Sequence, residues 1–189
     1  MSSYPVCHFC NDNINKEFAY FGLTLCEECF SGDVIKIMEN HGHRFSIRKY
    51  EVKNRNANHS PPHTFQIDLI RPQTFFIEMQ FHKQNGPHGF LTRLFSGKDP
   101  EIGIQEFDDN VKINVPNDQL PLLKRFLLHE QRRELIVWIT QHDLSLSIVG
   151  TSLTSGRKLE LPRFDPSVDE LARALVALGV HMAQFAKEI

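Results

Sequence analysis

The four cysteines constrain this chain most, because all of them fall within its first 29 residues. They form two Cys-x-x-Cys pairs, Cys7 with Cys10 and Cys26 with Cys29, separated by 15 intervening residues. Four thiolates at this spacing can enclose a zinc ion in a tetrahedron with zinc–sulfur distances of about 2.3 Å. We therefore predict one structural Zn²⁺ whose only ligands are these four cysteines. Two disulfides or redox dithiols are the alternative, which a cytoplasmic location disfavours.

The segments around the cysteines predict short elements. A turn is expected at residues 11–13, a hairpin at 18–25, and a helix after the second cysteine pair. Ser31 or Asp33 can cap this helix, and Gly42 ends it. His41 and His43 flank Gly42 and are expected to interact with the C-terminal dipole of the helix. His8 lies inside the first cysteine pair and is predicted to be a surface residue rather than a ligand.

The run CHFC, a hairpin, and then LCEECF leading into a helix resembles the treble-clef four-cysteine zinc fingers. The nearest likenesses are the zinc-binding domain of the ClpX unfoldase and the finger of the DksA/TraR transcription regulators. The resemblance covers about residues 5–40 and concerns the zinc ligands. It implies a structural metal and a protein-docking role. A segment of about 40 residues seldom folds without such a metal, so zinc should hold the finger together.

We expect two domains, a four-cysteine zinc finger at residues 1–42 and an α+β domain at residues 43–189. Alternating apolar residues predict a β-rich part over 43–116. Strands are expected at 44–52 with a bulge near Lys49, and at 65–69 and 75–82 as a hairpin turning at residues 71–73. Further strands are expected at 90–95 and 111–115, with loops at 54–63 and a polar connection at 96–106.

Helices and short strands are expected over residues 117–189. A helix starts near Pro121, and residues 130–141 fit either a helix or a strand, with helix preferred. Strands follow at 144–148 and 158–161, and a capping box of Ser167 and Glu170 starts the last helix. Its apolar stripe comprises Val168, Leu171, Leu175, Leu178, Met182, Phe185 and Ile189. This stripe can cover the antiparallel sheet of the same chain, the preferred interpretation, or pair with a second copy in a dimer.

The expected fold class is therefore α+β, with the finger first, then an antiparallel sheet packed by helices, and a long C-terminal helix. Residues 108–189 also resemble a domain of uncharacterised bacterial proteins, which implies no activity.

Catalytic motifs are missing from the sequence. It has no Gly-x-Ser-x-Gly elbow, no phosphate-binding loop and no cysteine beyond the four ligands. The histidines do not form a recognisable metal motif, because Ser60, Pro61 and Pro62 between His59 and His63 prevent a helix. His82 and His88 are expected in a solvated loop. His181 lies beside the apolar stripe of the last helix and is expected to be a border residue of that stripe. We predict no catalytic or cofactor-binding residues and no enzyme activity.

Charge limits the possible partners. The net charge of −2 gives no general attraction to nucleic acids or anionic lipids. The exception is one basic run, which a charged outer face of a strand explains equally well; it comprises Arg44, Arg48, Lys49, Lys53 and Arg55. A second basic cluster is offset by Glu130 and Glu134; it comprises Lys124, Arg125, Arg132 and Arg133. No apolar run is long enough to span a membrane and no secretion signal is recognisable, so a cytoplasmic protein is expected.

Three functions remain open from the sequence. The preferred one is a non-catalytic zinc-binding adaptor or regulatory protein that docks a protein partner, as a monomer or homodimer. The second is a nucleic-acid-associated regulator that uses the finger and the basic run over residues 44–55. The third is an enzyme of unknown class with its site in a cleft of the sheet.

Overall fold

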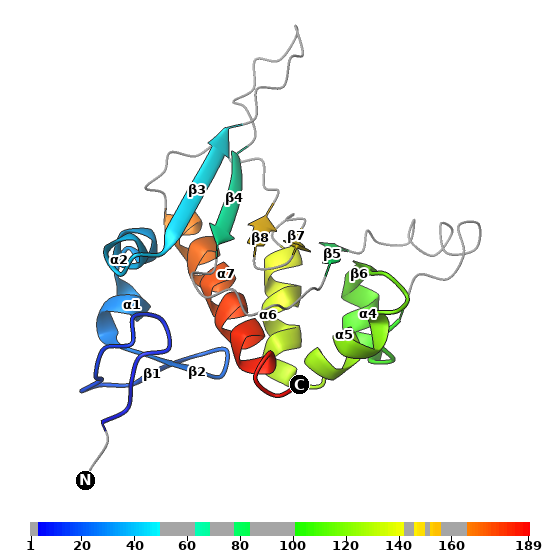
Figure 1. The fold of residues 1–189 in the computed structure, drawn as a ribbon, viewed down its shortest axis with the longest axis horizontal. Helices are drawn as coiled ribbons and strands as arrows, with labels where there is room; N and C mark the ends of the chain where they lie inside the picture. Colours follow the sequence, from blue (N-terminus) through cyan, green and yellow to red (C-terminus); the bar gives the residue numbers. More distant parts are fainter. Residues whose placement is uncertain are drawn as a thin grey trace, which may run out of the picture.

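The computed structural model describes residues 4–49, 63–68, 78–83, 101–141, 146–149, 152–155 and 166–189. The predicted α+β class is confirmed, with a two-stranded and a six-stranded antiparallel sheet and a long C-terminal helix (Figure 1). The first 49 residues contain β1 (Phe18–Tyr20), β2 (Leu23–Leu25), α1 (Glu27–Ser31), α2 (Val34–Asn40) and β3 (Arg44–Lys49). The later elements are β4 (His63–Asp68), β5 (Glu78–Lys83), α4 (Gln105–Asn110), β6 (Val111–Asn114), α5 (Leu120–Phe126), α6 (Glu130–Gln141), β7 (Leu146–Val149), β8 (Ser152–Ser155) and α7 (Pro166–Phe185).

The large sheet has the strand order β3-β4-β8-β7-β5-β6. The hairpin predicted between β4 and β5 is wrong, because β4 pairs with β3 and β8, while β5 pairs with β6 and β7. Alternation indicated the strands correctly, but it contains no information on which strand lies beside which. The strand β8 was not predicted, and the strand expected at 158–161 lies outside the described residues.

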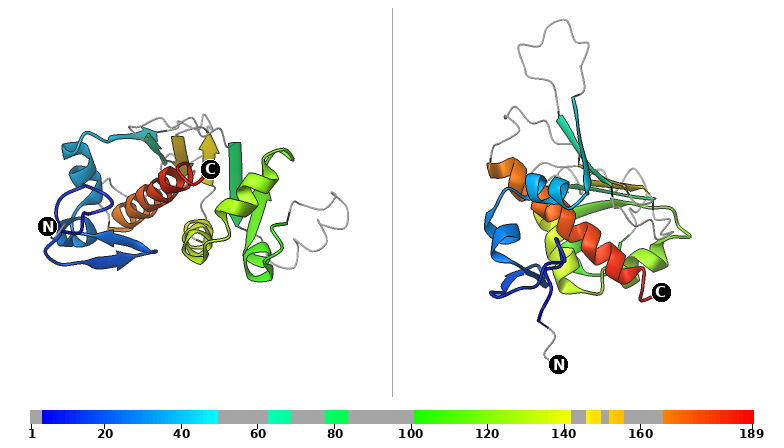
Figure 2. Two further views of the ribbon diagram at one scale, coloured as in Figure 1. Left: turned by 60° about the horizontal axis from the view of Figure 1, so that its bottom comes forward. Right: turned by 60° about the vertical axis from the view of Figure 1, so that its left-hand side comes forward.

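Helices α6 and α7 lie along one face of this sheet (Figures 1 and 2). Residues 130–141 are helical, as preferred, and α7 contacts α6, α2 and β4. Every stripe residue within α7 is at most 4% exposed. The stripe is therefore covered within a single chain, as the preferred interpretation requires. Ile189 lies beyond the helix and is 56% exposed. Because α7 begins at Pro166, Ser167 lies inside its first turn rather than at the predicted cap.

Two further sequence expectations change near the edge of the sheet. The polar connection expected over 96–106 contains the start of α4, which Asp108 organises by accepting the backbone N–H groups of Ile102, Gly103 and Ile104. Arg132, a member of the second basic cluster, is only 3% exposed. Its guanidinium lies over the ring of Phe126 and pairs with Glu188 at 2.9 Å. The buried guanidinium is stable here because its planar face lies against an aromatic ring and its N–H groups have an acidic partner.

Residues 4–43, called the finger segment below, share one hydrophobic cluster with the helices, which runs from Cys7 through α2 to Phe185 at the end of α7. None of the described helices is long and apolar enough to cross a membrane.

Candidate metal centre

The four cysteines come from two short turns that the hairpin β1–β2 separates. In the first turn, the Asn11 N–H donates to Cys7 O and the Cys7 N–H donates to Asp12 O, both at 2.9 Å. Asn11 has a φ of 64°, a left-handed conformation that asparagine tolerates well. In the second turn, Cys26 is the N-cap of α1, and its sulfur accepts from the Cys29 N–H at 3.4 Å. Both turns thus direct a pair of thiol groups toward the same point.

The sulfur atoms of Cys7, Cys10, Cys26 and Cys29 all lie within 4.8 Å of one another. Cys10 Sγ and Cys26 Sγ are 3.7 Å apart. A tetrahedron with a zinc–sulfur distance of about 2.3 Å has edges of about 3.8 Å. Three of the cysteines are buried and Cys26 is half-buried. This arrangement is compatible with a four-cysteine zinc site.

The electrostatics of the four thiols favour a bound cation. Hydrogen bonding to Cys29 lowers the pKa of Cys7 to about 4, and the backbone at Cys10, Cys26 and Phe9 lowers it further. Burial raises the pKa of Cys10 to about 12. The hydrogen bond with Cys7 raises the pKa of Cys29. Negative charges this close together repel one another, so four thiolates at these positions require the compensating charge of a metal ion.

The hairpin β1–β2 holds the first cysteine turn in place. Its turn has two residues, Phe21 with a φ of 44° and Gly22 with a φ of 77°. Both have the left-handed backbone conformation that tight hairpin turns require. The Thr24 N–H donates to His8 Nδ1 at 2.9 Å, and the His8 N–H donates to Thr24 O at 3.0 Å. His8 is exposed and outside the four-sulfur group, as predicted.

Helix α2 closes the finger segment. Of the two predicted caps, Asp33 is the N-cap and accepts from the Lys36 N–H at 3.0 Å, whereas Ser31 ends α1. Gly42, with φ 80°, follows α2, and the His43 N–H donates back to Met38 O. These bonds form a Schellman motif, so Gly42 ends the helix as predicted.

The two histidines beside Gly42 differ from one another. Nε2 of His41 lies 3.8 Å from Asp12 Oδ2, so a protonated His41 pairs with the first cysteine turn. Burial, followed by the neighbouring His41, lowers the pKa of His43. The charge–dipole role predicted for His43 is therefore disfavoured. Cys10, Asp12 and His41 also lie within 4.8 Å of one another, but Cys10 already belongs to the four-sulfur group.

One ion pair on α7 joins the finger segment to the rest of the molecule. The Val34 N–H at the start of α2 donates to Asp169 Oδ1 at 2.5 Å. Arg173 donates to Cys29 O at 3.3 Å and Gly32 O at 3.1 Å, and pairs with Asp169 at 2.8 Å. The carboxylate thus meets the positive N-terminus of α2, while the guanidinium meets carbonyls at the end of α1. Burial is the main influence on Asp169 and raises its pKa.

His181 provides a second connection between α7 and the finger segment. Its Nε2 lies 2.8 Å from Phe21 O in the hairpin turn, and the residue is 6% exposed. The border of the stripe at His181 is therefore buried against the hairpin. Burial lowers its pKa, so its ring is neutral at neutral pH. Sequence reasoning missed His181, Asp169 and Arg173 as contact residues, because an isolated polar residue beside an apolar stripe does not identify its partner.

Several candidate residues fall where no side chain is described. They are His59, His63, His82 and His88 and the basic residues Arg44, Arg48, Lys49, Lys53 and Arg55. The pairing of β3 with β4 is regular up to Lys49, the last residue of β3. A bulge beyond Lys49 would lie outside the described residues.

Comparisons with protein-family models, with curated proteins and with solved structures gave no match to this chain. The geometry of the four cysteines is therefore the evidence from which its function is inferred.

Proposed function

We propose that this chain is a non-catalytic zinc-binding adaptor or regulatory protein that docks a protein partner. The observation that carries the proposal is the group of four sulfur atoms within 4.8 Å of one another. Four thiolates complete the coordination of zinc, so the ion keeps no position open for a substrate or an activated water. Cys7, Cys10, Cys26 and Cys29 are its proposed ligands, and the metal has a structural role.

We assign residues 1–42 to a treble-clef finger and residues 43–189 to an α+β domain. The order of cysteine turn, hairpin, cysteine turn and helix supports the treble clef. The contacts of Asp169, Arg173 and His181 support a fixed placement of the finger against α7. In this proposal the zinc-loaded finger and the domain act as one surface.

Exposed apolar side chains on the finger support a docking role. Tyr4 is 64% exposed, Val6 45% and Phe30 37%. Large apolar side chains in water favour association with a partner when they lie close together on a surface. A cytoplasmic location remains part of this proposal.

Elemental analysis tests the metal, and affinity capture tests the adaptor. We expect one zinc per chain, no zinc in Cys26→Ser, and a partner captured from an extract of the source cells by the wild type alone. A chain without zinc, or X-ray absorption showing nitrogen ligands, would contradict the metal site. Equal capture by wild type and Cys26→Ser would contradict a role of the finger in docking.

The nucleic-acid alternative is tested separately, because its basic run lies outside the described side chains. Gel shifts with random DNA and RNA at several salt concentrations are suitable, since binding through phosphates weakens steeply as salt rises. A salt-dependent shift at micromolar protein would favour this alternative over the adaptor.

A further inference from the structure

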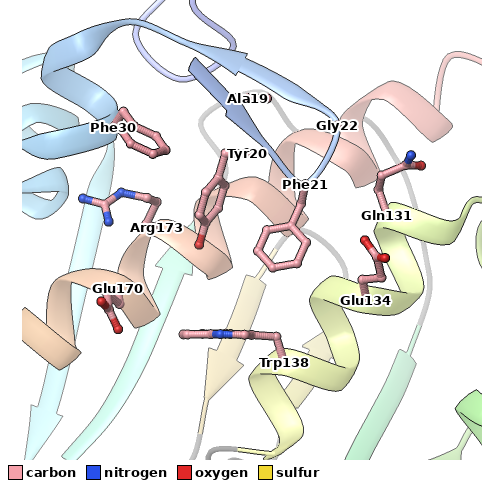
Figure 3. Close-up of a pocket in the computed structure, with 10 residues that line it drawn as sticks. All are labelled: Ala19, Tyr20, Phe21, Gly22, Phe30, Gln131, Glu134, Trp138, Glu170 and Arg173. Carbon is pink, nitrogen blue, oxygen red and sulfur yellow. The ribbon is translucent and has the colours of Figure 1, made fainter.

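A cavity of about 770 Å³ lies where the hairpin β1–β2 meets α6 and α7. Its lining includes the rings of Tyr20, Phe21, Phe30 and Trp138 (Figure 3). Most ligand pockets have volumes of about 300–1,000 Å³ and are lined by apolar and aromatic side chains with a few polar groups. The cavity is therefore large enough for a long side chain of another molecule.

Three of these rings enclose one part of the cavity. The rings of Tyr20 and Phe21 are 4.9 Å apart and nearly perpendicular, at 86°. Figure 3 shows both rings pointing toward Trp138, which is seen edge-on beneath them. The faces of aromatic rings attract cations, and three such rings line this part of the cavity.

The conformation of Phe21 is an independent sign that this arrangement matters. Its φ of 44° is strained for a large side chain, whereas glycine or asparagine would adopt it easily. Such residues concentrate at binding sites, where the surrounding structure holds them. Here the bond from His181 to Phe21 O and the close approach of Gly22 to Gln131 hold the turn.

The charged groups of the lining favour a positive ligand. Glu134 and Glu170 line the cavity, and neither makes an ion pair with another residue in the described part of the chain. Arg173 is the one cation of the lining, and its charge is compensated by Asp169 and by the carbonyls of Cys29 and Gly32. Burial raises the pKa of Tyr20 to about 12, so its hydroxyl is neutral and can accept or donate a hydrogen bond. Among the described residues of the lining, two carboxylates therefore have no ion-pair partner, whereas the one cation has its charge compensated.

We infer that this cavity binds an organic cation, namely the guanidinium group of an arginine side chain from the protein partner. The aromatic faces suit any organic cation, but the two carboxylates favour one that donates several hydrogen bonds. A quaternary ammonium group has no N–H to donate. The inference rests on the proposed function in one respect, namely that the arginine belongs to a protein partner.

Trp138 is the only tryptophan in the chain, so its fluorescence reports on this cavity directly. The zinc-loaded full chain is titrated with acetyl-arginine amide, acetyl-citrulline amide and acetyl-trimethyllysine amide. Citrulline has nearly the shape of arginine without its charge, and trimethyllysine has the charge without the donors. We expect a saturable change with arginine, at lower concentration than with trimethyllysine, and none with citrulline.

Variants connect the signal to the site. Glu170→Gln removes an exposed carboxylate of the lining and should weaken arginine binding about tenfold. Asp109→Asn is the matched control, because Asp109 is an exposed carboxylate on α4 outside the lining, and should bind like the wild type. Zinc content should be one per chain in both variants, which separates loss of this site from loss of the finger.

The inference is overturned by no response to arginine, by an equal response to citrulline, or by unchanged binding in Glu170→Gln. Tighter binding of trimethyllysine would overturn the guanidinium assignment. If any of these results occurs while the wild type holds zinc and captures its partner, the proposed function stands without this cavity.

Discussion

Residues 4–43 fold with strands of three residues and helices of five and seven, whereas α7 alone has 20 residues. Helices this short are unstable by themselves, because forming the first turn costs more than a few hydrogen bonds return. We therefore expect the finger segment to depend on a metal held by its four cysteines in addition to the shared core, while α7 depends on the burial of its stripe. Two kinds of stabilisation in one molecule should respond differently to metal removal, to core substitution and to pH.

Removing the metal should separate the two regions. Structural zinc contributes about 10 kcal/mol or more of binding free energy to a finger, so chelation or Cys29→Ser should unfold residues 5–40 first. Hydrogen exchange followed by mass spectrometry should show lost protection there, while residues 166–185 keep theirs. Asn15→Ser, an exposed change between the cysteine pairs, is the control and should keep its zinc. Simultaneous loss of protection in both regions would show that they unfold as one unit.

Substituting a buried residue of the stripe in α7 should lower the free energy of unfolding of the whole molecule. Leu175 is fully buried, and Leu175→Asp places an unpaired carboxylate in the core at a cost of about 4 kcal/mol. Urea unfolding should show this loss in a monomeric protein. Ala183→Asp, on the exposed side of the last turn of α7, should cost only about 1 kcal/mol, through lower helix propensity and repulsion from the C-terminal end of the helix dipole. A folded Leu175→Asp variant with a reduced mass in light scattering would instead support the dimer.

The ion pair between the two regions should matter more than an exposed one. Arg173→Met removes the hydrogen bonds to Cys29 O and Gly32 O and leaves Asp169 without its ion-pair partner, which should cost about 2–3 kcal/mol in urea unfolding. The pair of Lys16 and Glu27 has side chains 64% and 67% exposed. Lys16→Met should therefore cost less than about 0.5 kcal/mol. Equal costs would mean that Arg173 does not hold the finger against α7.

Acidification should have the smallest effect. The folded pKa of His181 is lowered, so the unfolded chain binds more protons and stability falls as pH drops below about 6.5. Between pH 7.5 and 6.0 this loss is at most about 0.8 kcal/mol. His181→Gln removes the titration and can still donate to Phe21 O, so its stability should fall less over the same range. Thermal unfolding of both proteins measures the difference, and identical pH profiles would exclude His181 as the cause.

The grouping of the four cysteines was predictable because its information is local. The spacing of Cys7, Cys10, Cys26 and Cys29 predicted that they lie together, and the structure brings their sulfur atoms within 4.8 Å of one another. Helix α7 was predictable for the same reason, since its apolar residues repeat every three or four positions. The boundaries of α6 also agree with the preferred helix over residues 130–141.

The pairing of the strands and the polar contacts between regions were decided only by the tertiary structure. Alternation marks a strand but does not identify its neighbour, so the β4–β5 hairpin was predicted where β4 pairs with β8. Asp169 meets Val34 across 135 positions of the sequence, and His181 meets Phe21 across 160. Residue type and spacing describe what a side chain can bind. Which partner it reaches depends on how distant segments pack, and that packing also forms the cavity between the finger, α6 and α7.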